Sequence, residues 1–240
     1  MSFPAPQPPF SAIDEPFKDV FTVQGGFRFG PGLGITRNMQ IVRQGGELTV
    51  INSVRLDAEG EAKLDALGKI THLVRLGAFH GADDPYYFDR YKPKLWAPPR
   101  TKHMGGLVTD EELVPGACPI EGATVFPFAH GKQPECAIVI PRDGGILITT
   151  DSYQNWESFD GCTFLGKLMM KAMAFGPTLI GGPWVKAMTP EVRPDFDALL
   201  ELPFAHLVPA HGQVLRDRAK DGLRTAIAKR FKGLSAKGGT

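Results

Sequence analysis

Short apolar runs alternate with helical patterns along the chain, and this alternation limits the possible folds more than any other feature. Between residues 26 and 56, β-branched residues separated by glycine turns indicate hairpins. Residues 57–68 change to a helical spacing that stops at Gly68, and residues 69–76 form another apolar run. Strand, helix and strand in that order predict a sheet covered by helices. We therefore expect an α/β fold.

The second half of the chain repeats the alternation. Residues 122–130 and 135–151 predict three strands, the last two joined by a turn at Asp143, Gly144 and Gly145. The other expected elements are an apolar helix over 164–176, a last short strand over 205–211 and an amphipathic helix over 214–231. Residues 83–104 and 176–189 are expected to form loops.

The size and charge of the chain restrict its organisation and its partners. With 240 residues, 42% of them hydrophobic, residues 18–240 are expected to form one domain after an irregular proline-rich arm over residues 1–17. The 27 basic and 26 acidic residues nearly cancel, so a small-molecule substrate is expected and a nucleic-acid partner is not. The methionine-rich helix Phe164–Phe175 is expected to pack in the core, with a homodimer face or a substrate-channel face as the alternative.

The sequence also predicts a cytoplasmic location. No apolar run reaches the roughly 18 residues of a membrane helix, and residues 1–10 lack the pattern of a signal peptide. The three cysteines are odd in number and far apart, which is typical of reduced thiols. No membrane association is expected.

Two familiar catalytic motifs are broken or absent. Gly161–Lys167 follows the pattern of a phosphate-binding loop, but Leu168 stands where a Ser or Thr should bind magnesium. The chain contains no Gly-x-Ser-x-Gly motif, which argues against a serine hydrolase.

A histidine or an aspartate follows four of the apolar runs. His80 follows LVRLGAF, His130 follows TVFPFA, Asp151 follows ILITT, and His211 follows LVPA. Because strand ends on one edge of a sheet face a common cleft, these side chains are expected to converge there. The remaining histidines, His72, His103 and His206, are better explained as strand or loop residues.

The chemistry of this group favours a metal ion. Imidazole nitrogens and carboxylate oxygens without thiolates favour zinc, with iron or manganese as alternatives, in a site open to water. A water bound to such an ion loses a proton near neutral pH and becomes a nucleophile. The sequence therefore predicts a metal site built from several strand ends.

The order of these features resembles the metallo-β-lactamase superfamily. VPAHG at Val208–Gly212 is similar to its closing Pro-Gly-His-Gly segment, and LITTD ending at Asp151 is similar to its Phe-Thr-Gly-Asp. The resemblance implies a four-layer αββα sandwich with the metal site at one edge of two facing sheets. It also implies a metal-dependent hydrolase that cleaves a small ester, amide, thioester or phosphoester with a metal-activated water.

The first motif of the superfamily, His-x-His-x-Asp-His, is incomplete here. Placing its first histidine on His80 puts Ala82 and Pro85 on the other two histidines and Asp84 on the aspartate. In this register the resemblance implies that His80, Asp84, His130, Asp151 and His211 are metal ligands. They would hold one ion rather than two, and Asp84 or Asp151 would orient the water or accept its proton.

A second interpretation also follows from the missing histidines. Histidine-poor members of the superfamily resemble this chain at His80, at DPYYFDRY and at LWAPP. The alternative function is therefore that of a metal-poor, non-catalytic descendant of the fold that binds a small ligand or a protein partner.

Overall fold

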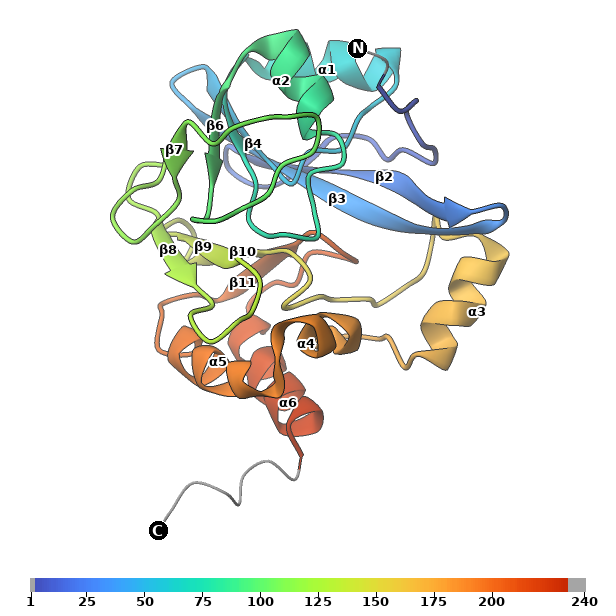
Figure 1. Ribbon diagram of the computed structural model, residues 1–240, viewed down its shortest axis with the longest axis vertical. Coiled ribbons are helices and arrows are strands. Elements are labelled where there is room, and N and C mark those ends of the chain that lie inside the picture. The colour runs from blue at the N-terminus through green and yellow to red at the C-terminus, as the bar shows by residue number, and fades with distance from the viewer. Residues whose placement is uncertain (1–2, 233–240) are drawn as a thin grey trace.

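The computed structural model describes residues 3–232, in which two sheets face each other between two layers of helices (Figure 1). The larger sheet has the spatial order β1 Asp14–Phe17, β2 Val20–Gly30, β3 Leu33–Gln44, β4 Glu47–Ile51, β5 Lys69–Val74, β6 Lys94–Ala97 and β7 Glu111–Glu112. The smaller sheet has the order β11 His206–Pro209, β10 Ile146–Thr149, β9 Cys136–Ile140 and β8 Thr124–Pro127.

The helices form the two outer layers. α1 Ala58–Leu67 and α2 Asp84–Tyr91 cover the larger sheet, and α4 Gly182–Met188, α5 Arg193–Leu199 and α6 Ala219–Arg230 cover the smaller one (Figure 1). A short 3₁₀ turn, Pro190–Val192, precedes α5. α3 Phe164–Ala172 lies apart from both layers, beside the tip of the β2–β3 hairpin. Among residues 3–232, no helix combines the length and the apolar character needed to cross a membrane.

Two of the crossover connections in the larger sheet contain a helix. β4 and β5 are parallel with α1 between them in the chain, and β5 and β6 are parallel with α2 between them. Parallel neighbours need such a connection because the chain must return to the same end of the sheet. The carboxyl ends of β4, β5 and β6 therefore lie at one edge.

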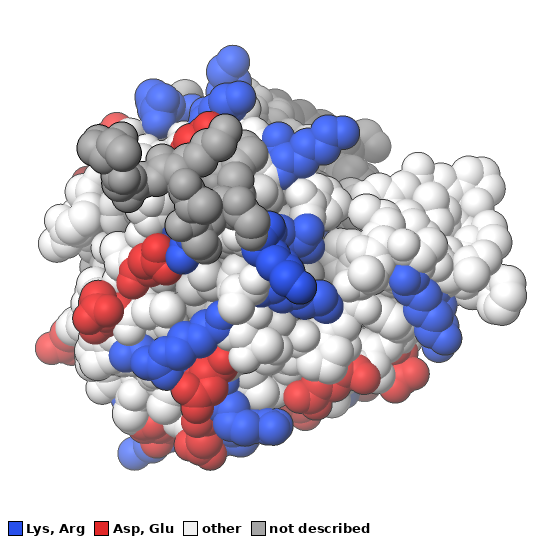
Figure 2. Space-filling view, turned by 90° about the horizontal axis from the view of Figure 1, so that it is seen from below, with Lys and Arg blue, Asp and Glu red and all other residues white. Residues whose placement is uncertain are grey.

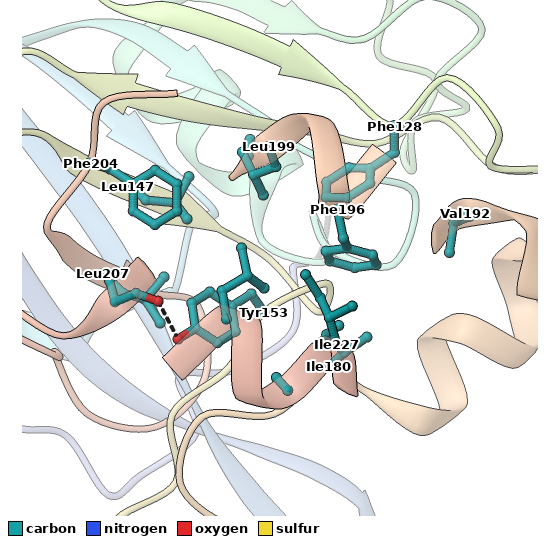
Figure 3. Close-up of a cluster of buried hydrophobic side chains, with 14 of the residues drawn as sticks. Phe128, Leu147, Tyr153, Ile180, Val192, Phe196, Leu199, Phe204, Leu207 and Ile227 are labelled. Atoms are coloured by element: carbon teal, nitrogen blue, oxygen red, sulfur yellow. Dashed lines mark hydrogen bonds between the residues drawn. The ribbon is translucent and has the colours of Figure 1, made fainter. Parts of the chain in front are cut away.

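Three apolar layers separate the four structural layers. Along β9 and β10, Ile138 and Ile148 point into the layer between the sheets, whereas Val139 and Leu147 point toward the helices. This alternation follows from the two-residue period of a strand. Figure 3 shows the helix-facing layer, in which Phe196 packs in the same cluster. The predicted αββα sandwich is confirmed.

Polar side chains of β3 join the two sheets. The Asn38 amide donates to the carbonyl oxygens of Pro209 at 3.0 Å and Gly212 at 2.7 Å, and the Gln40 amide donates to Pro209 O at 2.9 Å. The backbone N–H of Asn38 donates to Ala210 O at 2.7 Å. We call these bonds the inter-sheet clamp. It fixes the segment that follows β11 against the middle of β3.

The structure departs from the sequence prediction in segments expected to be irregular. The arm expected over residues 1–17 is shorter, because residues 14–17 pair with β2 as β1. Residues 84–91 form α2 because Tyr87 is buried against the larger sheet, and residues 182–188 form α4 because Trp184 and Met188 are buried against the smaller one. Tertiary burial decided these segments where local sequence favoured loops.

The last helix also starts later than predicted. It begins at Ala219 rather than Val214, because Leu215 forms an antiparallel bridge with Leu207 of β11. The two backbone bonds of this bridge hold residues 214–216 in an extended conformation, which delays the helix.

Asn38→Ala should destabilise the protein by about 1–3 kcal/mol, because it removes both bonds that the Asn38 amide donates to the clamp and leaves the buried Gly212 carbonyl without its amide donor. The measurement is urea unfolding followed by circular dichroism. Gln133→Ala is the control, since Gln133 is exposed. Equal unfolding midpoints for the two variants would show that the clamp does not hold the sheets together.

Candidate metal centre

Three of the sequence-predicted ligands lie together at the edge of the two sheets. The candidate ligand atoms of His80, Asp151 and His211 are all within 4.8 Å of one another. Nε2 of His80 lies 3.3 Å from Oδ2 of Asp151, and Nε2 of His211 lies 3.2 Å from Oδ1. We call this group the His80–Asp151–His211 centre.

Strand pairing explains why Asp151 and His211 meet. β10 and β11 are parallel neighbours, with Thr149 opposite Pro209, so Asp151 and His211 each follow the paired position by two residues. Their side chains must therefore leave the sheet at the same edge.

His80 reaches the centre by a longer path. The chain leaves β5 and crosses to the smaller sheet, where Gly77 bridges Glu135 and Leu76 O accepts from Cys136 N at 2.8 Å. This crossing brings the following residues toward the ends of β10 and β11.

The His211 ring is fixed in orientation. Its Nδ1 donates to Thr36 O at 3.0 Å, since a carbonyl oxygen can only accept. The indole of Trp156 stacks on the ring, with centroids 5.9 Å apart and planes at 21°. The next residue, Gly212, has φ +85°, and a Cβ there would lie 1.9 Å from Asn155 O. Only glycine therefore allows this turn behind the histidine.

The electrostatics of the centre fit a cation. Burial lowers the pKa of His80, which favours its neutral form. Burial opposes ionisation of Asp151, but the neighbouring imidazoles of His80 and His211 outweigh it and lower the pKa of this carboxyl. Nε2 of His80 and Nε2 of His211 each face one carboxylate oxygen of Asp151, at 3.3 Å and 3.2 Å. Two imidazole nitrogens and a carboxylate within reach of one ion are the donor types that zinc takes in proteins, so the residues present fit a metal ion.

The other two predicted ligands lie outside the centre, which corrects their sequence-based placement. Asp84 is buried at the start of α2, where Ser53 Oγ donates to its Oδ1 at 2.6 Å. His130 is exposed, and its Nδ1 lies 2.7 Å from Oδ1 of Asp195. Asp84 begins a helix that packs on the larger sheet, and the loop after β8 turns His130 toward α5.

The three histidines interpreted as structural have partners of their own. His72 accepts from Trp96 Nε1 at 3.0 Å, His103 Nε2 lies 2.8 Å from Thr109 Oγ1, and His206 Nε2 lies 2.7 Å from Asp143 O. None of them belongs to the His80–Asp151–His211 centre.

Buried charged residues beside the centre were missed by the sequence analysis. Glu135 accepts from Trp184 Nε1 at 2.7 Å and from the Thr150 hydroxyl, next to Asp151. Arg37 and Arg75 line a cavity that His80, Asp151 and His211 also line. The signal for Arg75 and Glu135 was present, since each charge interrupts or precedes an apolar run, as in LVRLGAF and ECAIVI.

Solved structures of metallo-β-lactamases match this chain over nearly its whole length. The DIM-1 metallo-β-lactamase has a TM-score of 0.67 at 12% identity, covering 92% of this chain and 98% of the other. FIM-1 from Pseudomonas aeruginosa, in its mono-zinc form, has a TM-score of 0.65 at 12% identity over 95% and 99% of the two chains. A metallo-β-lactamase from Hirschia baltica has a TM-score of 0.61 at 13% identity over 92% and 98%.

The chain has the metallo-β-lactamase fold. Neither a model of a known protein family nor a curated protein sequence matches it. The similarity to the metallo-β-lactamases is therefore one of structure, at identities of 12–13% for the three named above. This fold is the one that the sequence resemblance implied. His80, Asp151 and His211 lie together at one edge of its two sheets.

Asp151→Ala should lower the zinc bound by the purified protein several-fold, because it removes the carboxylate that faces both imidazoles. His72→Ala is the control, since His72 bonds only to Trp96 within the described residues. Elemental analysis after zinc loading and gel filtration gives the measurement. Equal zinc content in the two variants would exclude Asp151 as a ligand.

Glu135 should make the metal-free protein less stable as the pH rises. Burial, followed by the charge of Asp151, raises its pKa from 4.5 to about 8. The folded state thus keeps a proton that the unfolded state loses, so stability falls between about pH 5 and about pH 8.

Glu135→Gln imitates the protonated side chain and should remove this part of the pH dependence, on the order of a few kcal/mol. Urea unfolding in chelator at several pH values measures it, with the exposed Glu121→Gln as control. If the Glu135→Gln and wild-type curves stay parallel over this range, Glu135 is ionised in the folded state.

Proposed function

We propose that the protein is a metal-dependent hydrolase that cleaves a small ester, amide, thioester or phosphoester. The observation that carries the proposal is the His80–Asp151–His211 centre, which lies at a sheet edge and lines two cavities through Asp151 and His211. A site that combines metal-binding donors with adjacent open space can hold a substrate at the reacting group.

The donor set supports one ion, with zinc as the expected metal. Two imidazoles and one carboxylate are the protein ligands of many catalytic zinc sites, in which the remaining position is open. The group is the sole cluster of three such side chains among residues 3–232. A bound zinc would polarise the scissile group and activate a water molecule. The mono-zinc form of FIM-1 is a metallo-β-lactamase with this fold and one metal.

The sequence suggested Asp84 and Asp151 as catalytic residues, and we assign the catalytic role to Asp151. Its carboxyl stays ionised at neutral pH because the imidazoles lower its pKa, so it can hold a cation and accept a hydrogen bond from water. Asp84 lies away from the centre and bonds to Ser53 instead. We propose that Asp84 supports the site rather than reacting in it.

The alternative is a non-catalytic descendant of the fold. It is motivated by Ala82 and Pro85, which occupy two motif positions that the resemblance assigns to histidines. The structure favours the hydrolase because three donors still converge without those histidines. Catalytic zinc sites with three protein ligands need no further side chain.

The zinc-loaded protein should hydrolyse at least one of four generic chromogenic substrates: an aryl ester, a thioester, a phosphodiester and a β-lactam. Removal of the metal should abolish the rate, and Asp151→Ala should lower kcat/KM by about 100-fold or more. His72→Ala should keep the wild-type rate. A rate that survives both chelation and Asp151→Ala would refute the proposal, as would no turnover of any of these substrates by protein shown to contain zinc.

A further inference from the structure

Two cavities of about 290 Å³ each meet at the His80–Asp151–His211 centre. Both are lined by Asp151 and His211, and both extend past Phe29 and Ile35. Both also have apolar walls, but they differ in charge: one contains Arg37 and Arg75 beside Phe27, Phe79 and Met104, whereas the other contains methionines and aromatic rings and, among its described lining residues, no basic side chain besides His211. We call them the arginine cavity and the methionine cavity.

Arg75 in the arginine cavity is a buried cation that forms no direct ion pair within residues 3–232. It is 4% exposed, and its Nε and Nη2 donate to the carbonyl oxygens of Gly77 at 3.0 Å and Ala78 at 2.7 Å. Its Nη1 has no hydrogen-bond partner in the described part of the chain. The Asp84 carboxyl acts on this guanidinium electrostatically but forms no direct bond with it. A buried charge without a direct partner is costly, so a guanidinium that lines a cavity in this state is suited to receive an anion.

Arg37 places a second guanidinium in the same cavity. It is 7% exposed, forms an ion pair with Asp83 and lies 4.9 Å from the centre of the Phe27 ring. Its Nε also lacks a partner among the residues that the structure describes. A planar guanidinium held in this way can give a further bond to a carboxylate or a phosphate.

The segment after His80 is built around these two arginines. Asp83 forms the ion pair with Arg37, and the Asp84 carboxyl and the Arg75 side chain both lie close to Gly81. A Cβ on Gly81, where φ is +98°, would lie 2.5 Å from Asp84 Oδ2 and 2.9 Å from Arg75 Cζ. Close packing therefore fixes Arg75 beside the centre.

The methionine cavity is apolar. Its walls include Met169, Met170, Met173, Phe175, Trp156 and Trp184. Methionine side chains are flexible and polarisable, so they adapt to apolar chains of varied shape. In Figure 2 the side of the molecule where α3 and the β2–β3 tip lie carries few charged side chains, in contrast to the mixed charges elsewhere on that face.

We propose that the substrate is an amide, ester or thioester with an apolar acyl chain and an anionic leaving group. The acyl chain occupies the methionine cavity, and the carboxylate or phosphate of the leaving group contacts Arg75 and Arg37. This inference rests on the proposed hydrolase function and narrows its substrate class.

The reaction balances with water alone. The water oxygen forms a bond to the acyl carbon, and the bond from that carbon to nitrogen, oxygen or sulfur breaks. One proton of the water passes to the leaving group. The products are an apolar carboxylic acid and an amine, alcohol or thiol that retains its anion.

Binding can be tested without turnover. N-decanoylglycine and its uncharged amide, N-decanoylglycinamide, are compared by calorimetry on the metal-free protein. The carboxylate should bind about tenfold more tightly or better, the value expected for a charged hydrogen bond. Equal affinities for the two compounds would refute the anion site whether or not the zinc-loaded protein is a hydrolase.

Variants test which residues cause the preference for the carboxylate over the uncharged amide. Arg75→Met should reduce the ratio of the two affinities to about one, Arg75→Lys should restore part of it, and the exposed Arg218→Met should leave it unchanged. Met170→Trp should weaken the binding of both compounds equally, because the larger side chain fills the methionine cavity. If Arg75→Met does not fold, Arg37→Met replaces it. An unchanged ratio in the arginine variants, or unchanged affinity in Met170→Trp, would overturn the assignment.

Binding and turnover together separate this inference from the proposed function. Preferential binding of N-decanoylglycine, with no turnover of any of the four chromogenic substrates by the zinc-loaded protein, would support the site and refute the hydrolase. Cleavage of the neutral aryl ester, with equal affinities for the two decanoyl compounds, would support the hydrolase and refute the site.

Discussion

The inter-sheet clamp is the interaction on which the rest of the site depends. β3 belongs to the larger sheet and the segment after β11 to the smaller one, and the Asn38 and Gln40 amides bond the carbonyls of that segment. Apolar side chains fill the space between the sheets elsewhere, and apolar packing alone is not directional. Amide-to-carbonyl bonds are directional, so they set the position of one sheet relative to the other. His211 lies within the clamped segment, and its ring is oriented by a bond to the backbone of Thr36, which also belongs to β3.

Buried charges beside the centre form a connected system. Arg37 and Arg75 line a cavity that the centre also lines, Asp83 pairs with Arg37, and Glu135 accepts from Thr150, the residue before Asp151. In a medium of low polarity each of these charges affects its neighbours more strongly than it would in water. The pKa of Glu135 is raised in this surrounding, first by burial and then by the charge of Asp151.

The stretch LGAFHGADDPYY shows where sequence reasoning succeeded and where it could not. His80 was predicted from its place after an apolar strand, and the structure brings it to Asp151 and His211. Asp84 was assigned by motif register, but it begins α2 and turns toward Ser53. Register counts residues along the chain, whereas a helix start rotates side chains away from the direction that a loop would give them. The prediction that His130 is a ligand was wrong for a similar reason. The residues of the loop after β8 do not by themselves determine its path, and the folded loop turns His130 toward Asp195.

The sequence by itself determined the layers. Short apolar runs, glycine turns and helical spacings specify strands and helices locally, so the residues alone predicted the α/β class, and the order of the motifs added the αββα sandwich. The sequence also predicted that Asp151 and His211 would lie near each other, and the parallel pairing of β10 with β11 brings them to one edge. Only the tertiary structure decided that three donors rather than five converge, and that Arg37 and Arg75 line the cavity beside them. Those outcomes depend on contacts between residues far apart in the chain, which the local pattern of apolar and polar residues does not encode.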